Sequence, residues 1–140
     1  MANSQVRWGR VLLGGLAAPL FAIMLTILAV FTYATTLAFR VRGQPDAQRI
    51  AHFASRVGPI GGPVLTMVFT AIIAGWLARR AGDEARLHGV MIGVVAAILV
   101  LIIGAAFGGG LKVSNVLAAG LTIAAGWVGA QLVARRGHGS

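Results

Sequence analysis

Few residues in this chain could do chemistry. Its acidic residues are Asp46, Asp83 and Glu84, and it has no cysteine. Carboxylates act as general acids and bases and bind hard metal ions, while cysteine supplies thiolate nucleophiles and zinc ligands. We therefore expect no catalytic, cofactor-binding or metal site, and a protein that is not an enzyme.

The rest of the composition indicates a lipid environment. Of the 140 residues, 58% are hydrophobic and 11% are charged, whereas an ordinary soluble domain has roughly 45–50% apolar and about 25% charged residues. A soluble chain of this length could not bury so much apolar surface, because small domains bury the smallest fraction of their chain. The composition predicts an integral membrane protein.

Four uncharged stretches are each long enough to cross a bilayer as a helix. A helix rises about 1.5 Å per residue, so about 20 residues cross a hydrocarbon core of about 30 Å. Membrane strands are not expected, because they would show alternating segments of about 10 residues rather than continuous apolar runs. The sequence predicts an all-α, polytopic protein with a single transmembrane domain over residues 1–140, whose spans cover about residues 11–39, 59–78, 88–108 and 113–134.

The connection after the first span contains a predicted short amphipathic helix over residues 46–57. Pro45 disfavours helical geometry before it, and Asp46 is a good N-cap. Apolar residues recur at helical spacing and polar residues occupy the other faces. The apolar set is Ile50, Phe53, Ala54 and Val57, and the polar set is Gln48, Arg49, His52, Ser55 and Arg56. Glycines and prolines over residues 58–63 are expected to end this helix, which would lie in the headgroup plane as a lipid or partner contact, or would cap the bundle end.

Two matches within the chain indicate a tandem pair of helical hairpins. At an offset of 79 residues the start of the first span matches the start of the third, and at an offset of 56 the end of the second span matches the end of the fourth. The matched pairs include Arg7 with Arg86, Gly14 with Gly93, Leu65 with Leu121 and Ala78 with Ala134. Both hairpins would then point the same way, as a parallel repeat. Convergence of Ala- and Gly-rich membrane helices is the alternative.

Small residues recur at four-residue spacing in every predicted span. Apolar burial does not drive helices together in lipid, so close backbone approach through small residues contributes more to helix association. We predict helix packing, within one chain or between subunits, at Gly14, Ala18, Gly75, Gly89, Gly93, Ala97, Gly126 and Ala130. Pro19 is expected to kink the first span, because it cannot donate a hydrogen bond to the preceding turn.

Basic residues lie at the borders of the spans and set the expected orientation. The net charge is +9, but these residues are scattered along the borders, so we expect lipid phosphates rather than nucleic acid as partners. The side with both termini holds more arginine and lysine, which favours cytoplasmic termini in a bacterial inner membrane. The predicted headgroup or interface residues are Arg49, His52, Arg56, Arg79, Arg80, Arg135 and Arg136. His52 and His88 fall on opposite sides without companion ligands, so we expect structural or interfacial roles for both.

The predicted spans contain no Asp, Glu, Lys or Arg, whereas intramembrane charges are typical of proton and ion pathways. This absence argues against a coupled transporter. Among uncharged polar residues, Asn115 near the start of a span is expected to be a helix cap. We expect a non-enzymatic structural or accessory subunit whose partners are membrane lipids, other copies of itself or a larger membrane complex. The alternatives are a passive channel or uniporter for a small solute, or a lipid-modifying enzyme that uses Asp46 or His52 at the interface.

One stretch resembles small bacterial four-helix membrane proteins. Residues 74–82 read Ala-Gly-Trp-Leu-Ala-Arg-Arg-Ala-Gly, and His-Gly-Val-Met-Ile-Gly follows at residues 88–93. This order is similar to the pattern of that family, in which an Ala-Arg end of helix two leads into a His-Gly-x-x-x-Gly start of helix three. The resemblance implies a four-helix fold and a bacterial membrane location. The activity of the family is unknown, so the resemblance implies no catalytic residues.

Overall fold

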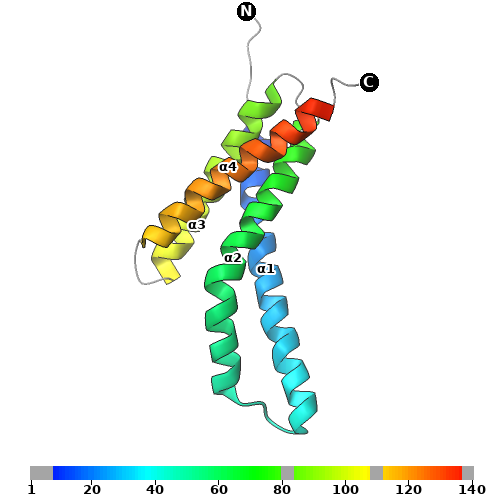
Figure 1. Cartoon of the computed structure of the whole chain (residues 1–140), viewed down its shortest axis with the longest axis vertical. Helices are drawn as coiled ribbons and strands as arrows, with labels where there is room; N and C mark the ends of the chain where they lie inside the picture. Colours follow the sequence, from blue (N-terminus) through cyan, green and yellow to red (C-terminus); the bar gives the residue numbers. More distant parts are fainter. Residues whose placement is uncertain (1–7, 80–83, 108–111, 137–140) are drawn as a thin grey trace, which may run out of the picture.

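The chain folds into four long helices. The computed structural model describes residues 8–79, 84–107 and 112–136. In chain order the helices are α1 (Trp8–Val41), α2 (Ala47–Ala78), α3 (Ala85–Phe107) and α4 (Val113–Arg136) (Figure 1). Each helix is long and apolar enough to span a membrane. The expected all-helical architecture, with four helices long and apolar enough for a multi-pass protein, is therefore confirmed.

The helices run alternately up and down. The start of α1 and the end of α4 lie at one end of the molecule, and the α1–α2 connection lies at the other (Figure 1). Both α2 and α3 pack against all three other helices, whereas α1 and α4 have no comparable contact between their described residues. A strict two-fold axis between the hairpins would relate α1 to α3 and α2 to α4. The contact between α2 and α3 would then be repeated between α4 and α1. The predicted tandem arrangement is therefore not confirmed.

The amphipathic helix predicted over residues 46–57 is not a separate element. It forms the first turns of α2, which continues unbroken through Pro59 and Pro63. The expectation that these prolines and their neighbouring glycines end the helix is wrong. Membrane helices tolerate proline because a broken helix would leave more backbone groups without partners in lipid. The turn after the prolines gains a further bond, since the Thr66 hydroxyl donates to the Gly62 carbonyl at 2.9 Å.

The apolar face of these first turns packs on α1. Tyr33 stacks on Phe53, with ring centroids 4.2 Å apart and an interplanar angle of 12°. The partly buried residues of this face are Ile50, Phe53, Ala54 and Val57, and the exposed residues around it are Gln48, Arg49, His52, Ser55 and Arg56. The predicted faces are therefore correct, and the apolar face has a helix as its neighbour.

The α1–α2 hairpin reaches beyond α3 and α4 (Figure 1). The two helices have 34 and 32 residues, whereas α3 and α4 have 23 and 24. At a rise of about 1.5 Å per residue, the excess corresponds to about 12–17 Å. We refer to residues 28–57, which contain this excess and the adjoining part of the hairpin, as the hairpin extension. Its tip includes Arg42, whose φ of 51° lies in the left-handed region.

The buried core lies in the half of the molecule next to the termini. Val11, Ala74 and Ile92 form its centre. Every residue from 23 to 65 is described, and none of them is buried. The molecule therefore has one closely packed end and one open end.

Candidate functional site

Close backbone contacts hold α3 against α4. A Cβ added to Gly93 would lie 2.9 Å from the Ile123 Cα and 3.1 Å from the Ile123 carbonyl oxygen. A Cβ added to Gly126 would lie 2.5 Å from the Gly89 carbonyl oxygen, and one added to Gly89 would collide with the Cβ of Ala130. Real Cβ atoms do not come this near to backbone, so the helices can approach to this distance only where side chains are absent.

The other predicted packing residues also lie in the interior. A Cβ added to Gly75 would lie 3.1 Å from the Gly129 carbonyl oxygen of α4. Gly14 faces side chains of α2 and α3, while Ala18 and Ala97 are buried. The structure thus places all the predicted packing residues inside the bundle, so these small-residue faces are occupied within one chain.

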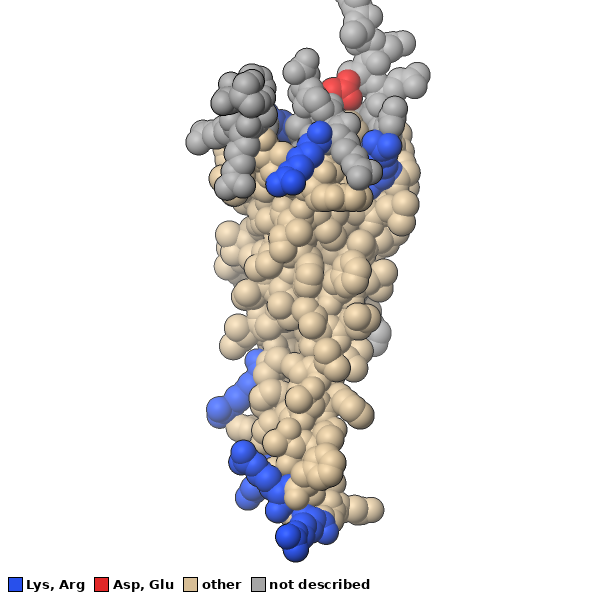
Figure 2. Space-filling model, turned by 90° about the vertical axis from the view of Figure 1, so that its right-hand side faces the viewer, with Lys and Arg blue, Asp and Glu red and all other residues tan. Residues whose placement is uncertain are grey.

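In the view of Figure 2, basic side chains lie at the upper end of the molecule and over part of its lower half, and the surface between these two groups carries no charged side chain. The predicted interface residues with described, exposed side chains are Arg49, His52, Arg56 and Arg79. Arg80 lies outside the described residues. Arg135 and Arg136 are the last two residues of α4, and their side chains are not among those that the structure describes. An uncharged band between charged ends is the distribution that a bilayer requires.

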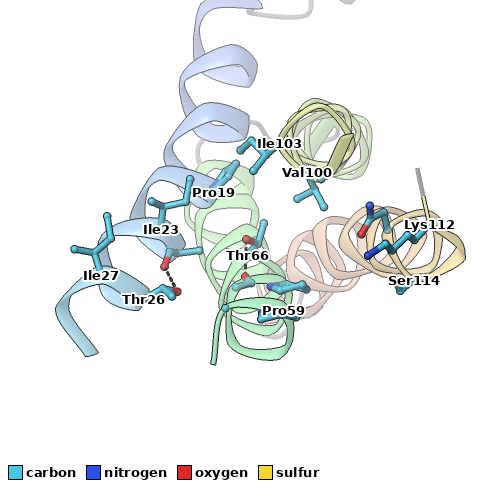
Figure 3. Close-up of a pocket in the computed structure, with 16 residues that line it drawn as sticks. Pro19, Ile23, Thr26, Ile27, Pro59, Thr66, Val100, Ile103, Lys112 and Ser114 are labelled. Atoms are coloured by element: carbon cyan, nitrogen blue, oxygen red, sulfur yellow. Dashed lines mark hydrogen bonds between the residues drawn. The ribbon is translucent and has the colours of Figure 1, made fainter. Parts of the chain in front are cut away.

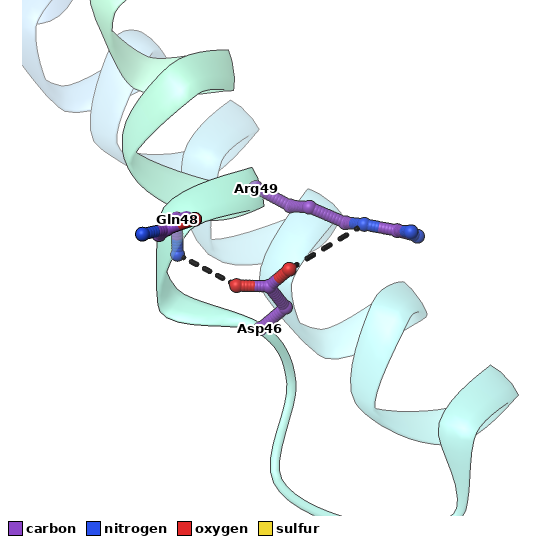
Figure 4. A network of polar contacts seen from close by, with 3 residues as sticks. All are labelled: Asp46, Gln48 and Arg49. Atoms are coloured by element: carbon purple, nitrogen blue, oxygen red, sulfur yellow. Dashed lines mark hydrogen bonds and ion pairs between the residues drawn. The ribbon is translucent and has the colours of Figure 1, made fainter.

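Asp46 organises the start of α2 in the hairpin extension (Figure 4). Its Oδ1 accepts a hydrogen bond from the Gln48 N–H at 2.9 Å, and its Oδ2 lies 3.6 Å from the Arg49 Nε. Both charged side chains are more than half exposed, so the ion pair contributes little. The predicted N-cap is confirmed, and this carboxylate has a structural role.

The outer face of the extension is apolar and exposed. Leu28, Phe31 and Phe39 are 54%, 67% and 80% exposed. Three neighbouring threonines donate their hydroxyl hydrogens to carbonyls four residues earlier, at 2.8–2.9 Å: Thr32, Thr35 and Thr36. These bonds satisfy the hydroxyls within α1. The face therefore suits an apolar neighbour.

A cavity of about 500 Å³ opens where the four helices diverge (Figure 3). It lies between the packed end and the hairpin extension, and all four helices contribute to its walls. It is lined by Pro19, Ala22, Ile23, Thr26 and Ile27 of α1, by Gly58, Pro59, Gly62, Pro63 and Thr66 of α2, by Val100, Ile103 and Gly104 of α3, and by Lys112, Ser114 and Asn115 at the start of α4.

The walls of this cavity are mostly apolar. The Thr26 and Thr66 hydroxyls donate to carbonyls of their own helices at 2.8 and 2.9 Å, as Figure 3 shows. Ala22 and Thr66 are 1% and 4% exposed and form part of the closed inner wall. Among the described residues that line the cavity, Lys112 is the only charged one, and it is exposed.

Asn115 is not the N-cap residue of α4. It is the third residue of the helix, and its N–H donates to the Lys112 carbonyl at 2.9 Å. Its side chain lies against α3, since a Cβ added to Gly104 would be 2.7 Å from the Asn115 Nδ2. The expected cap is therefore wrong in position, and the amide packs at the cavity wall instead.

The two histidines lie far apart in the fold. His88 is buried near the start of α3, where its Nδ1 lies 3.1 Å from the Glu84 carbonyl oxygen, while His52 is exposed on the hairpin extension. Across residues 8–79, 84–107 and 112–136, no three His, Asp or Glu residues are grouped so that they could hold a metal ion.

The four spans define a multi-pass, all-helical membrane protein. Comparison of the chain with protein-family models, with curated proteins and with solved structures gives no match. Function is therefore inferred from the geometry of the chain's own residues.

Proposed function

We propose that the protein is a non-enzymatic accessory subunit of a bacterial inner-membrane complex, and that its hairpin extension contacts the partner. The observation that carries the proposal is the exposed apolar face of α1, where Phe31 and Phe39 are 67% and 80% exposed. Outside the hydrocarbon core, contiguous exposed apolar surface is typical of interaction sites, and its removal from water contributes about 25 cal/mol per Å².

The lengths of the helices support a contact beyond the hydrocarbon core. With 23 and 24 residues, α3 and α4 are about 35 Å long, close to the thickness of a bilayer core of about 30 Å. The extension then reaches past the core on the side opposite the termini. The distribution of basic residues favours cytoplasmic termini. The hairpin extension would then contact its partner on the outer side of the membrane.

Charge favours a different protein over a second copy as the partner. The extension carries Arg40, Arg42, Arg49 and Arg56 against a single acidic residue, Asp46. Two copies in one membrane have the same orientation, so neighbouring extensions would bring like charges together. The partner would present an apolar helix with acidic residues at the level of these arginines.

Photo-crosslinking in intact cells tests this proposal. A photoreactive residue at Phe31 or Phe39 should give one discrete protein adduct, and Arg49→Glu together with Arg56→Glu should weaken it. Leu13, which is 72% exposed at the packed end, is the matched control position and should give no such adduct. An adduct with the mass of two copies, or equal adducts at all three positions, would contradict the proposal.

The cavity favours a passive pathway for a small solute as the second candidate. Such a pathway would have to continue through the packed end, where Val11, Ala74 and Ile92 fill the centre. Flux through liposomes that contain the purified chain separates the two functions. Selective permeation that depends on the protein would support the pathway and contradict the accessory subunit.

A further inference from the structure

We infer that the cavity binds one acyl chain of an anionic amphiphile, with a phosphate or carboxylate head beside Lys112. This inference does not depend on the partner proposed above, because it concerns other residues. The volume of about 500 Å³ lies within the range of about 300–1,000 Å³ typical of small-molecule sites.

The walls favour a hydrocarbon chain over water or a polar solute. Pro19, Ala22 and Ile103 supply apolar surface, and the Thr26 and Thr66 hydroxyls are already bonded within their own helices. A buried water needs about two to four polar partners, and both threonine hydroxyls of this part of the cavity already donate to carbonyls. An acyl chain from the surrounding lipid packs against apolar walls and needs no polar partners.

Lys112 and Ser114 lie together at one place on the cavity wall, apart from the Thr26 and Thr66 hydroxyls (Figure 3). Lys112 and Ser114 belong to the start of α4, where the span begins at Val113. A lysine at the border of a span places its ammonium group at the headgroup level. The N-terminus of a helix also favours a negative charge, so both features select an anionic head over a neutral one.

Native mass spectrometry tests the inference on the purified full chain in neutral detergent. With phosphatidylglycerol and phosphatidylcholine at equal concentration, the chain should retain one phosphatidylglycerol, with a preference of about threefold, as expected for one exposed ion pair. Lys112→Gln should abolish the preference while the chain still binds lipid. Equal retention of both lipids by the unsubstituted protein would overturn the inference.

A substitution inside the cavity tests the site of the acyl chain. Gly62 lines the cavity, and a Cβ added there would meet no atom within 4 Å, so Gly62→Leu adds a side chain at the cavity wall without a clash at its Cβ. We expect retention of phosphatidylglycerol to fall by about tenfold, which corresponds to about 1.4 kcal/mol. Gly120→Leu is the matched control, because a Cβ at Gly120 also meets no atom within 4 Å and this residue does not line the cavity. If Gly62→Leu melts like Gly120→Leu and retains lipid equally well, the cavity is not the binding site.

Competitors distinguish the sources of the anionic head. Displacement of phosphatidylglycerol by oleate would assign the site to free fatty acids as well as phospholipids, and failure of oleate to displace it would assign the site to phospholipids. Glycerol 3-phosphate has the head without the chain and should not compete. Its displacement of the lipid would show that the chain contributes nothing, which would overturn the inference.

Discussion

Gly93 lies where α3 closely approaches α4, so its substitution directly tests how these two helices pack. Gly93→Leu would drive a side chain into the backbone of Ile123, which is 2.9 Å from the position of a Cβ. Overpacking of this kind costs about 1–3 kcal/mol, and we expect a lower melting temperature in detergent. Gly120→Leu should leave the melting temperature unchanged or raise it, because its surroundings are open. A wild-type melting temperature for Gly93→Leu would contradict the close approach of these helices.

Thr70 and Thr122 provide a matched pair of fully buried hydroxyls. Among the described residues, the Thr70 hydroxyl has no hydrogen-bond partner, whereas the Thr122 hydroxyl donates to the Ala118 carbonyl at 2.7 Å. An unsatisfied buried hydroxyl costs about 1–3 kcal/mol, so Thr70→Val should raise the free energy of unfolding by about 1 kcal/mol. Thr122→Val should lower it or leave it unchanged. Equilibrium unfolding of both variants in one detergent checks this, and greater loss in Thr70→Val than in Thr122→Val would contradict it.

The start of α2 depends on one side chain. Asp46→Ala removes the hydrogen bond to the Gln48 N–H and should destabilise the first turn by about 1 kcal/mol. Asp46→Asn keeps a capping oxygen and loses only the exposed pair with Arg49, so it should have little effect. Hydrogen exchange of residues 47–50, followed by mass spectrometry, measures the difference. Equal fraying in the two variants would assign the effect to charge rather than to the cap.

The apolar runs predicted the four helices well because length and hydropathy decide whether a segment can span a bilayer. The first span was expected over residues 11–39 and lies within the helix Trp8–Val41, and the third was expected over 88–108 and corresponds to the helix Ala85–Phe107. The course of α2 could not be predicted in the same way. Its amphipathic face indicates an apolar neighbour, but spacing alone does not distinguish lipid from α1. Proline also ends helices in water more often than in membranes.

The sequence predicted the packing residues but neither the cavity nor the exposed face of the extension. Four-residue spacing found the small residues that lie inside the bundle, but it could not tell which helix each one faces, because that depends on how the helices cross. No spacing predicts the cavity, since its walls combine residues such as Pro19, Gly62, Ile103 and Lys112 from four helices. The exposed face of the extension depends likewise on the unequal lengths of the two hairpins.

At the scale of the whole molecule, the orientation in the membrane can be tested because the chain has no cysteine. Ser55 is exposed on the hairpin extension, so Ser55→Cys should react with an impermeant thiol reagent added to intact cells. Ser4→Cys and Ser140→Cys, at positions outside the described residues, should react only after lysis, because positive charge favours cytoplasmic termini. Labelling of the terminal positions in intact cells would reverse the proposed orientation.

The contact between α2 and α4 has a consequence for biosynthesis. Gly129 comes so near to Ala71 that a Cβ at Gly129 would collide with the backbone of α2. The ribosome makes α4 after α2 and α3, so the face of α2 that receives Gly129 meets lipid or the insertion machinery until α4 emerges. The close contact between α2 and α4 can therefore form only after α4 has been made, and an arrested intermediate that lacks α4 would offer this vacant face to membrane proteases.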